Sequence, residues 1–302
     1  MKKIILPLVI LFGLALPAQA KVINVVTTTT DLKSVVEYIG GDRVKVFSLG
    51  KGNQNYHFLQ AKPSYMIKAK KADLFIRIGL DFEVGYEPLI LEGSRNKNIR
   101  AGRDGHLDAS VGIKPLDVHK EVDRSMGDIH GQGNPHYWLD PLNMKIVASS
   151  ITNRLIKLSP QNESYFKENL TKFNNLIDTK MNEWGEILAP HGGKKLITYH
   201  KSWSYFAKRF GFEIVGELEP KPGVPPSPSH LKNIINIVNQ ESVELILLEN
   251  FYKDNAAQYI AERTGVKVVV TPLSVGGTKE ADNYISLMDI IVRNIKEGLN
   301  RD

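Results

Sequence analysis

The sequence predicts an α/β protein of two lobes, each with a parallel sheet flanked by helices, joined by one long rigid helix. Short runs of β-branched residues alternate with amphipathic segments, and this order occurs once in each half of the chain. Between the halves, apolar side chains recur at helical spacing over residues 163–188. A helix between two strands favours parallel pairing, because the crossover brings the chain back in the same direction.

The first half begins with a strand, a helix and a second strand. Gly40 and Gly41 follow an amphipathic segment, as glycines commonly do at the end of a helix, and Pro63 opens the next helix. The polar stretch 103–133 contains glycines and three histidines, which predicts a surface loop. The expected strands are residues 22–27, 44–49 and 73–78, and the expected helices are residues 32–39 and 63–71.

The second half repeats the plan of the first. Five prolines in the run 219–228 predict a stiff, extended segment along the lobe surface. The expected strands are residues 195–200, 212–218 and 243–248, and the expected helices are residues 203–211 and a segment that opens at Pro228.

The segment between the two halves is predicted to be one continuous helix. Residues 163–188 contain no glycine before Gly185 and no proline, so the helix would be about 38 Å long at about 1.5 Å per residue. Such a helix is a rigid strut. We therefore expect a signal peptide at 1–20, an N-terminal lobe at 21–160, a linking helix at 161–189 and a C-terminal lobe at 190–302.

Composition narrows the functional classes. The chain has 302 residues and is 42% hydrophobic, which is enough for two lobes that each have a core. Its net charge of +6 is mild, and no basic block alternates with aromatic residues, so nucleic acid is not an expected partner. The absence of cysteine from the sequence excludes disulfides and thiolate metal ligands.

The first twenty residues have the pattern of a cleavable secretory signal. Lys2 and Lys3 precede an apolar stretch at 4–16, and an Ala-x-Ala sequence ends at Ala20. The stretch is shorter than the roughly 20 residues that a membrane-spanning helix needs. We expect a monomeric mature chain that starts at Lys21 and lies free in the periplasm, without a lipid anchor.

Four potential metal ligands stand where the parallel strands are expected to end. His57 follows the second strand, and His136 lies in a turn before a helix. His200 and Glu249 end two strands of the second half. In open parallel sheets, ligands bind beyond the carboxyl ends of the strands. Three imidazoles and a carboxylate suit a tetrahedral zinc site, so we predict one divalent ion held between the two lobes.

Several motifs resemble the zinc- and manganese-binding solute-binding proteins of bacterial ABC importers, and the resemblance covers essentially the whole chain after residue 20. The motifs are Pro135-His-Tyr-Trp-Leu-Asp-Pro, His57 with Lys62-Pro63-Ser64, Tyr199-His200 with Tyr205-Phe206 and Gly211, and Thr264-Gly-Val-Lys-Val. The resemblance implies that His57, His136 and His200 are metal ligands. It also implies capture of the ion outside the cytoplasm and delivery to the membrane permease of an importer.

The sequence departs from the family at one ligand position. The family commonly has an Asp after the strand that follows the Gly-Val-Lys motif, where this chain has Thr271. A neutral hydroxyl is a poor zinc ligand. We predict Glu249 as the fourth ligand, with water as the alternative. The His-rich loop of the family is reduced here to His119, Asp128 and His130, which are expected to collect ions weakly.

The remaining conspicuous side chains are expected to be structural. Tyr137, Trp138 and Leu139 are predicted core residues, and Asp140 is predicted to cap the following helix, with orientation of His136 as its alternative role. The surface positions that we expect are His106, His191, His230, Glu217 and Glu219.

The predicted function is therefore capture of a divalent transition ion, with zinc favoured over manganese because manganese prefers harder oxygen ligands. The chain is not expected to be an enzyme, since it has no His-Glu-x-x-His, Gly-x-Ser-x-Gly or phosphate-binding glycine motif. Three alternatives remain open at this point: a periplasmic zinc-dependent hydrolase, a manganese-specific binding protein, and an adhesin that holds a metal.

Overall fold

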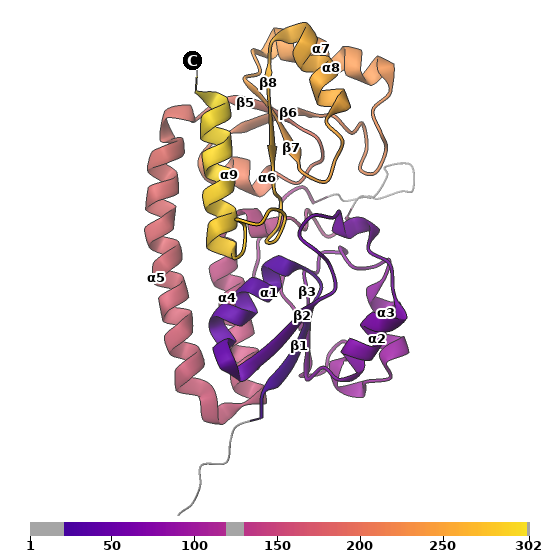
Figure 1. Ribbon diagram of the computed structural model, residues 1–302, viewed down its shortest axis with the longest axis vertical. Helices are drawn as coiled ribbons and strands as arrows, with labels where there is room; N and C mark the ends of the chain where they lie inside the picture. The colour runs from indigo at the N-terminus through magenta and orange to yellow at the C-terminus, as the bar shows by residue number, and fades with distance from the viewer. Residues whose placement is uncertain (1–20, 119–129, 301–302) are drawn as a thin grey trace, which may run out of the picture.

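A computed structural model describes residues 21–118 and 130–300. The predicted signal peptide at 1–20, together with His119 and Asp128, lies outside these ranges. The described chain forms two parallel sheets that lie in separate lobes, one above the other (Figure 1). Among the helices described, none has the length and apolar character needed to cross a membrane.

The N-terminal sheet has the strand order β2-β1-β3-β4, and all its pairs are parallel. Its edge strand, β4, falls inside the stretch 103–133 that was predicted to be a loop. The prediction missed it because β4 has only three residues and no alternating pattern. The elements of this half are β1 (Ile23–Thr27), α1 (Thr30–Gly40), β2 (Val44–Ser48), α2 (Pro63–Lys70), β3 (Leu74–Arg77), α3 (Glu87–Ser94), β4 (His106–Asp108) and α4 (Pro141–Leu158).

The C-terminal sheet has the order β6-β5-β7-β8, again with parallel pairs, so the predicted repetition of one plan is confirmed. Alternate residues of a strand face opposite sides of its sheet. In β7, Leu245 and Leu247 therefore face one side while Ile246 faces α7 and α8. The elements are β5 (Lys195–Thr198), α6 (Ser204–Phe210), β6 (Glu213–Glu217), α7 (Pro228–Glu241), β7 (Leu245–Glu249), α8 (Asn255–Thr264), β8 (Lys267–Thr271) and α9 (Tyr284–Leu299).

The helix between the halves, α5 (Glu163–Leu188), has the predicted bounds and is continuous over 26 residues. It runs along one side of the molecule beside both lobes (Figure 1). Its buried residues, which include Phe166, Phe173 and Trp184, pack toward α1, α4 and α9. The fold class predicted from the sequence, with two lobes and one long joining helix, is confirmed.

The two lobes do not have wholly separate cores, which corrects the expectation from chain length. One apolar cluster contains Val25 and Ile76 of the first sheet together with Leu245 and Leu247 of the second. Helix α9 belongs to this cluster and contacts both α5 and α1, although it ends the chain. Only the outer faces of the sheets have clusters of their own, beneath α2 and α3 in one lobe and beneath α7 and α8 in the other.

Polar contacts also join the lobes close to the expected site. The indole Nε1 of Trp138 donates to the carbonyl oxygen of Leu273 at 3.0 Å. The backbone N–H of Val275 donates to Oδ1 of Asp31 at 3.0 Å, and the hydroxyl of Thr30 donates to the carbonyl oxygen of Val275 at 2.6 Å. These hydrogen bonds hold the two lobes together close to the expected site.

Candidate metal centre

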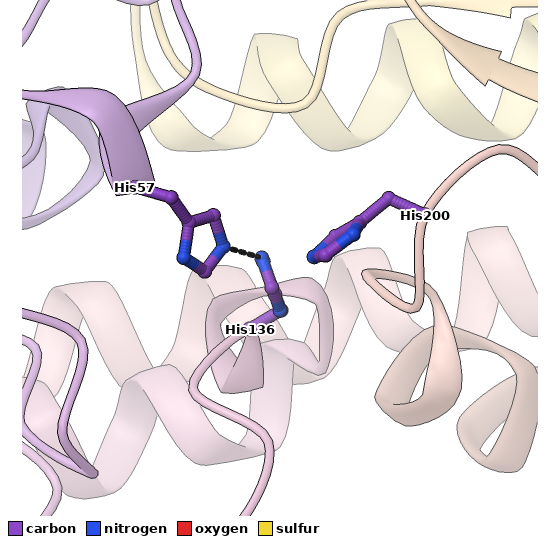
Figure 2. A group of neighbouring side chains, drawn as sticks. All are labelled: His57, His136 and His200. Carbon is purple, nitrogen blue, oxygen red and sulfur yellow. Dashed lines mark hydrogen bonds between the residues drawn. The ribbon is translucent and has the colours of Figure 1, made fainter. Parts of the chain in front are cut away.

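Three predicted ligands meet between the lobes. One ring nitrogen from each of His57, His136 and His200 lies within 4.8 Å of the other two, and the three rings point toward one another (Figure 2). We call them the three-histidine cluster. His57 lies on a short 3-10 turn, Tyr56–Phe58, after β2, while His136 immediately precedes another such turn. His200 follows β5, so both lobes contribute.

His136 is held by the side chain of Asn134. Its Nδ1 lies 2.8 Å from Oδ1 of Asn134, and its backbone N–H donates to the same oxygen at 3.0 Å. The amide orientation is fixed because Nδ2 of Asn134 donates to Asp117 at 3.0 Å and to the carbonyl oxygen of Lys201 at 2.7 Å. Since an amide oxygen only accepts, the proton of His136 is on Nδ1 and its Nε2 presents a lone pair.

His200 is held by a carboxylate. Its Nδ1 lies 2.8 Å from Oε2 of Glu219, and both side chains are buried. A carboxylate on the outer nitrogen of a ligating imidazole fixes the ring and raises its basicity. The expectation that Glu219 lies on the surface is therefore wrong, because its backbone continues the pairing of β6 with β5, the N–H donating to the carbonyl oxygen of Tyr199 at 3.0 Å, and its side chain lies against His200. The backbone N–H of Gly223, in the proline-rich run, donates to Oε2 of Glu219 at 3.2 Å.

His57 has a histidine as its outer partner. Its Nε2 lies 3.2 Å from Nε2 of His136, and its Nδ1 lies 3.3 Å from Nε2 of His130. The edge of the ring packs against Phe82, with ring centroids 4.7 Å apart. Asn55 caps the short turn by accepting the backbone N–H of His57 at 3.0 Å.

The electrostatic environment keeps two of the three rings, His57 and His136, uncharged. Burial, followed by the neighbouring His200, lowers the pKa of His57 well below the usual histidine range. Burial and the neighbouring His57 and His200 do the same to the pKa of His136. Both rings are therefore neutral at neutral pH, which is the form that coordinates a metal ion.

The space between the rings is small. The cavity measures about 10 Å³ and is lined by His57, His136, His200, Phe82 and Trp138 among others. That volume corresponds to roughly one water-sized sphere. The space between the rings therefore has room for a single ion.

Glu249 and Thr271 do not point into this space. Oε1 of Glu249 accepts from Nε1 of Trp203 at 3.2 Å, and its Oε2 makes no hydrogen bond within the described chain. Burial raises the pKa of Glu249 to about 7, while the nearby His200 lowers it. Oγ1 of Thr271 accepts from Asn294 on α9 at 3.2 Å, so this hydroxyl faces away from the cluster.

Some expectations for other residues are confirmed and others are wrong. Asp140 caps α4 by accepting the backbone N–H of Leu142, whereas Asn134 orients His136 in its place. Tyr137, Trp138 and Leu139 are fully buried, as predicted for core residues. Three histidines are not surface residues: His106 is buried against Glu87, His191 is buried, and His230 is half-buried against the carbonyl oxygen of Glu217.

The partners of the three rings are residues that the sequence did not reveal as functional. Asn134 could have been found from its spacing, since a side chain two positions before a histidine can accept both its backbone N–H and its ring proton. Glu219 and His130 carry no such local signal, because each reaches its histidine from a distant part of the chain.

Two α/β lobes, each with a parallel sheet, hold three imidazoles between them. This arrangement belongs to the class of substrate-binding proteins that bind a metal ion for an ABC importer. The chain matches the family described as zinc-uptake complex component A, periplasmic, over residues 25–298, and it belongs to that family. This is a family of extracytoplasmic transport proteins.

The relatives of this chain are named for different metals. It is 26% identical over 287 residues to the iron-binding protein YfeA of Yersinia pestis, covering 93% of this chain and 88% of the relative. It is 24% identical over 294 residues to the manganese ABC transporter substrate-binding lipoprotein PsaA of Streptococcus pneumoniae, covering 96% and 93%. Metal binding is thus common to the family, whereas the ion differs among its members.

Solved structures share the fold. The crystal structure of ZnuA superposes with a TM-score of 0.79 at 24% identity, covering 93% of this chain and 100% of that chain. A periplasmic metal-binding protein from Candidatus Liberibacter asiaticus gives a TM-score of 0.76 at 22% identity, covering 92% and 100%.

Proposed function

We propose that this protein captures zinc outside the cytoplasm with His57, His136 and His200 and delivers it to the permease of an ABC importer. The observation that carries the proposal is the convergence of three ring nitrogens within 4.8 Å. Zinc–imidazole bonds of about 2.0–2.1 Å place the ligand nitrogens roughly 3–3.5 Å apart in a tetrahedral site. The 3.2 Å separation between Nε2 of His57 and Nε2 of His136 suits this geometry.

The donor set supports zinc over manganese. The cluster offers nitrogen atoms only, and imidazole suits zinc, while manganese is better served by carboxylate and carbonyl oxygens. Copper and nickel also bind imidazole strongly. In a titration, these late transition ions, rather than manganese, are therefore the ions expected to compete with zinc for the site. The name of the family, which refers to zinc uptake, agrees with this choice.

We retain Glu249 as the proposed fourth ligand. Its Oε2 is buried without a hydrogen bond, and burying an unpaired carboxylate oxygen is costly. His200 lowers the pKa of Glu249, so the two groups are neighbours. Rotation of the side chain toward the cluster would pair this oxygen with the ion and offset part of its charge. Water remains the alternative in the fourth position.

A zinc-dependent hydrolase is the second function that a three-histidine site could support. We favour transport because the space between the rings, about 10 Å³, suits a single ion and because the family that the chain matches is one of metal-uptake proteins. Among the described residues, the two acids nearest the cluster are already engaged: Glu219 bonds Nδ1 of His200, and Glu249 accepts from Nε1 of Trp203.

The cellular setting follows from the same proposal. We propose that residues 1–20 are removed on secretion and that the mature protein works as a free periplasmic monomer, although the named streptococcal relative is a lipoprotein. The N-terminal lobe (21–160) and the C-terminal lobe (190–302) would each supply ligands, with the linking helix (161–189) between them.

Titration of histidine variants tests the proposal. His57→Ala, His136→Ala and His200→Ala should each weaken zinc binding by a factor of at least 100, because each removes one of the coordinating groups. Competition with a chromophoric chelator would measure the dissociation constant. Wild-type zinc affinity in any of the three variants would exclude that residue from the site, and wild-type affinity in all three would refute the proposed function.

A further inference from the structure

A fourth histidine, His130, lies against the outer side of His57. Its Nε2 is 3.3 Å from Nδ1 of His57. The two rings are stacked, with centroids 5.1 Å apart and planes inclined by 25°. His130 belongs to a segment distant in sequence from His57, and the cluster does not include it as a member.

The protons on these rings can be placed one after another. Nδ1 of His136 donates to the amide oxygen of Asn134, so Nε2 of His136 is an acceptor. The 3.2 Å contact between the two Nε2 atoms therefore requires the proton of His57 to be on its Nε2. Nδ1 of His57 is then an acceptor as well, and the hydrogen bond at 3.3 Å comes from Nε2–H of His130.

An ion bound at Nε2 of His57 reverses this arrangement. The coordinating nitrogen must carry no proton, so the proton of His57 is then on Nδ1. Nδ1–H now needs an acceptor, and Nε2 of His130 can serve because a neutral imidazole nitrogen either donates or accepts, depending on its tautomer. Both rings keep one proton each, so the change involves no net charge. A Lys in place of His130 could only donate, and a carboxylate could only accept.

We propose that His130 is a positioning residue for His57, bonding Nδ1 of that ring in both tautomers and so directing Nε2 toward the ion. This inference rests on the function proposed above, since it requires His57 to be a ligand. It assigns to His130 a task different from the weak collection of ions that the sequence suggested for its loop.

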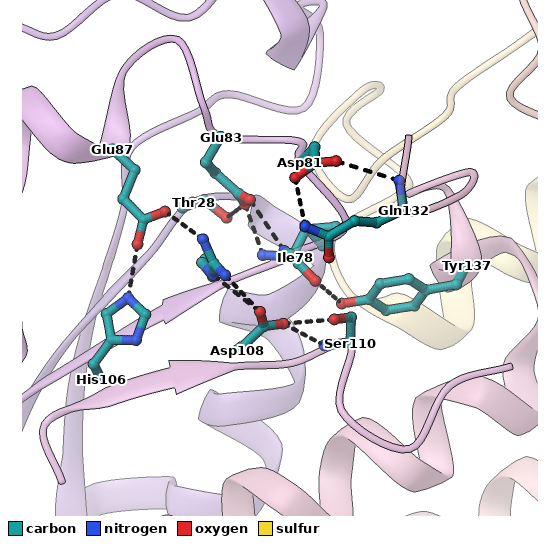
Figure 3. A network of polar contacts seen from close by, with 12 residues as sticks. Thr28, Ile78, Asp81, Glu83, Glu87, His106, Asp108, Ser110, Gln132 and Tyr137 are labelled. Atoms are coloured by element: carbon teal, nitrogen blue, oxygen red, sulfur yellow. Dashed lines mark hydrogen bonds and ion pairs between the residues drawn. The ribbon is translucent and has the colours of Figure 1, made fainter. Parts of the chain in front are cut away.

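A strained turn in the N-terminal lobe holds the segment that carries His130. Three successive residues after β3, Gly79, Leu80 and Asp81, have φ angles of 84°, 52° and 65°. This left-handed conformation is unfavourable for a residue with a side chain. Oδ1 and Oδ2 of Asp81 accept from the side-chain amide and backbone N–H of Gln132, at 2.7 and 3.3 Å (Figure 3).

The turn is itself anchored from the core. The buried carboxylate of Glu83 accepts the backbone N–H of Ile78 at 2.7 Å (Figure 3). It also accepts the backbone N–H of Gly79 at 3.0 Å. Phe82, between Asp81 and Glu83, packs against His57 and has its ring centroid 6.0 Å from that of His130. One turn therefore supports both histidines, which explains why a strained backbone is retained there.

The decisive comparison is between two replacements of His130. His130→Leu has similar bulk but can neither donate nor accept, whereas His130→Gln keeps one donor and one acceptor. Removing the outer partner of a metal-binding histidine typically weakens metal binding by about 10- to 100-fold. We expect that loss for His130→Leu and a change of no more than about threefold for His130→Gln. His230→Leu, which removes a half-buried histidine on α7, is the matched control and should bind zinc like the wild type.

Imidazole ¹⁵N–¹H spectra of the histidine-labelled protein provide a second readout that a merely structural role would not change. The His57 signal, assigned by its absence in His57→Ala, should move from an Nε2–H to an Nδ1–H pattern when zinc is added. Wild-type zinc affinity in His130→Leu, or equal losses in His130→Leu and His130→Gln, would overturn the inference. If His57→Ala itself bound zinc normally, the proposed function would fail instead.

Discussion

The carboxylate of Glu219 should be the most informative residue outside the cluster. It accepts the ring proton of His200 at 2.8 Å, and both side chains are less than 10% exposed, so solvent screens the interaction little. A hydrogen bond to a charged group contributes about 1.5–3 kcal/mol, against about 0.5–1.5 kcal/mol for a neutral one. Glu219→Gln keeps an acceptor but loses the charge, which corresponds to a loss of about 1–1.5 kcal/mol and roughly tenfold weaker zinc binding. Glu219→Ala, which also loses the bond, should approach 100-fold.

Zinc titration against a competing chelator would measure this graded series. Glu213→Gln is the matched control, because Glu213 lies at the opposite, exposed end of β6. The midpoint of thermal unfolding without metal should be recorded for each variant, so that a change in folding is separated from a change in binding. Wild-type zinc affinity in Glu219→Gln would show that His200 needs no charged partner, and the reasoning would be wrong.

Three further predictions concern the fourth ligand, the helix and the lobe contact. Glu249→Gln should weaken zinc binding by at least tenfold if its carboxylate coordinates the ion, whereas Thr271→Asp should change it little because that side chain faces Asn294; unchanged binding in Glu249→Gln would leave the fourth position to water. Small-angle scattering should give nearly the same radius of gyration with and without zinc, because α5 is continuous and lacks a kink; a large change would contradict this. Burial raises the pKa of Asp31 to about 7 in the folded protein. The protonated side chain therefore makes its full contribution to the free energy of unfolding below about pH 4, and this contribution is lost as the pH rises through 7. Asp31→Asn should therefore flatten the decline of the unfolding free energy between pH 5 and 8, measured by urea denaturation with a chelator; an unchanged slope would exclude Asp31 as its source.

The elements that could be predicted from the sequence are those with a strong local signal. Helix α5 was placed at its observed bounds because apolar residues recur at one spacing for seven turns without a proline. The first three strands of each sheet were recognised because each is a short run of apolar and branched residues bounded by turn or helix signals. Strand β4 has the sequence His-Leu-Asp and gives no such signal, since its place in the sheet depends on pairing with β3.

Only those site residues that lie in recognisable sequence motifs could be predicted. The three histidines lie in recognisable local sequences, and the topology brings them together. Their supporting residues depend on how distant segments fold against one another, which single-chain patterns do not reveal. Glu219 is the clearest case: the prolines after it indicated an exposed segment, and most of that segment is exposed, but Glu219 itself still pairs with Tyr199 of the neighbouring segment and is buried against His200.

The apolar cluster shared by the two lobes limits how a protein of this kind can change its cargo. Because α9 and the inner faces of both sheets are packed together, exchanging one lobe for that of a relative would place mismatched side chains across the whole shared interior. Exchange of a whole lobe is therefore a costly way to acquire a new metal preference, whereas a substitution beside the ion leaves the shared interior unchanged. The named relatives and the family, which refer to iron, manganese and zinc, are similar to this chain along most of its length.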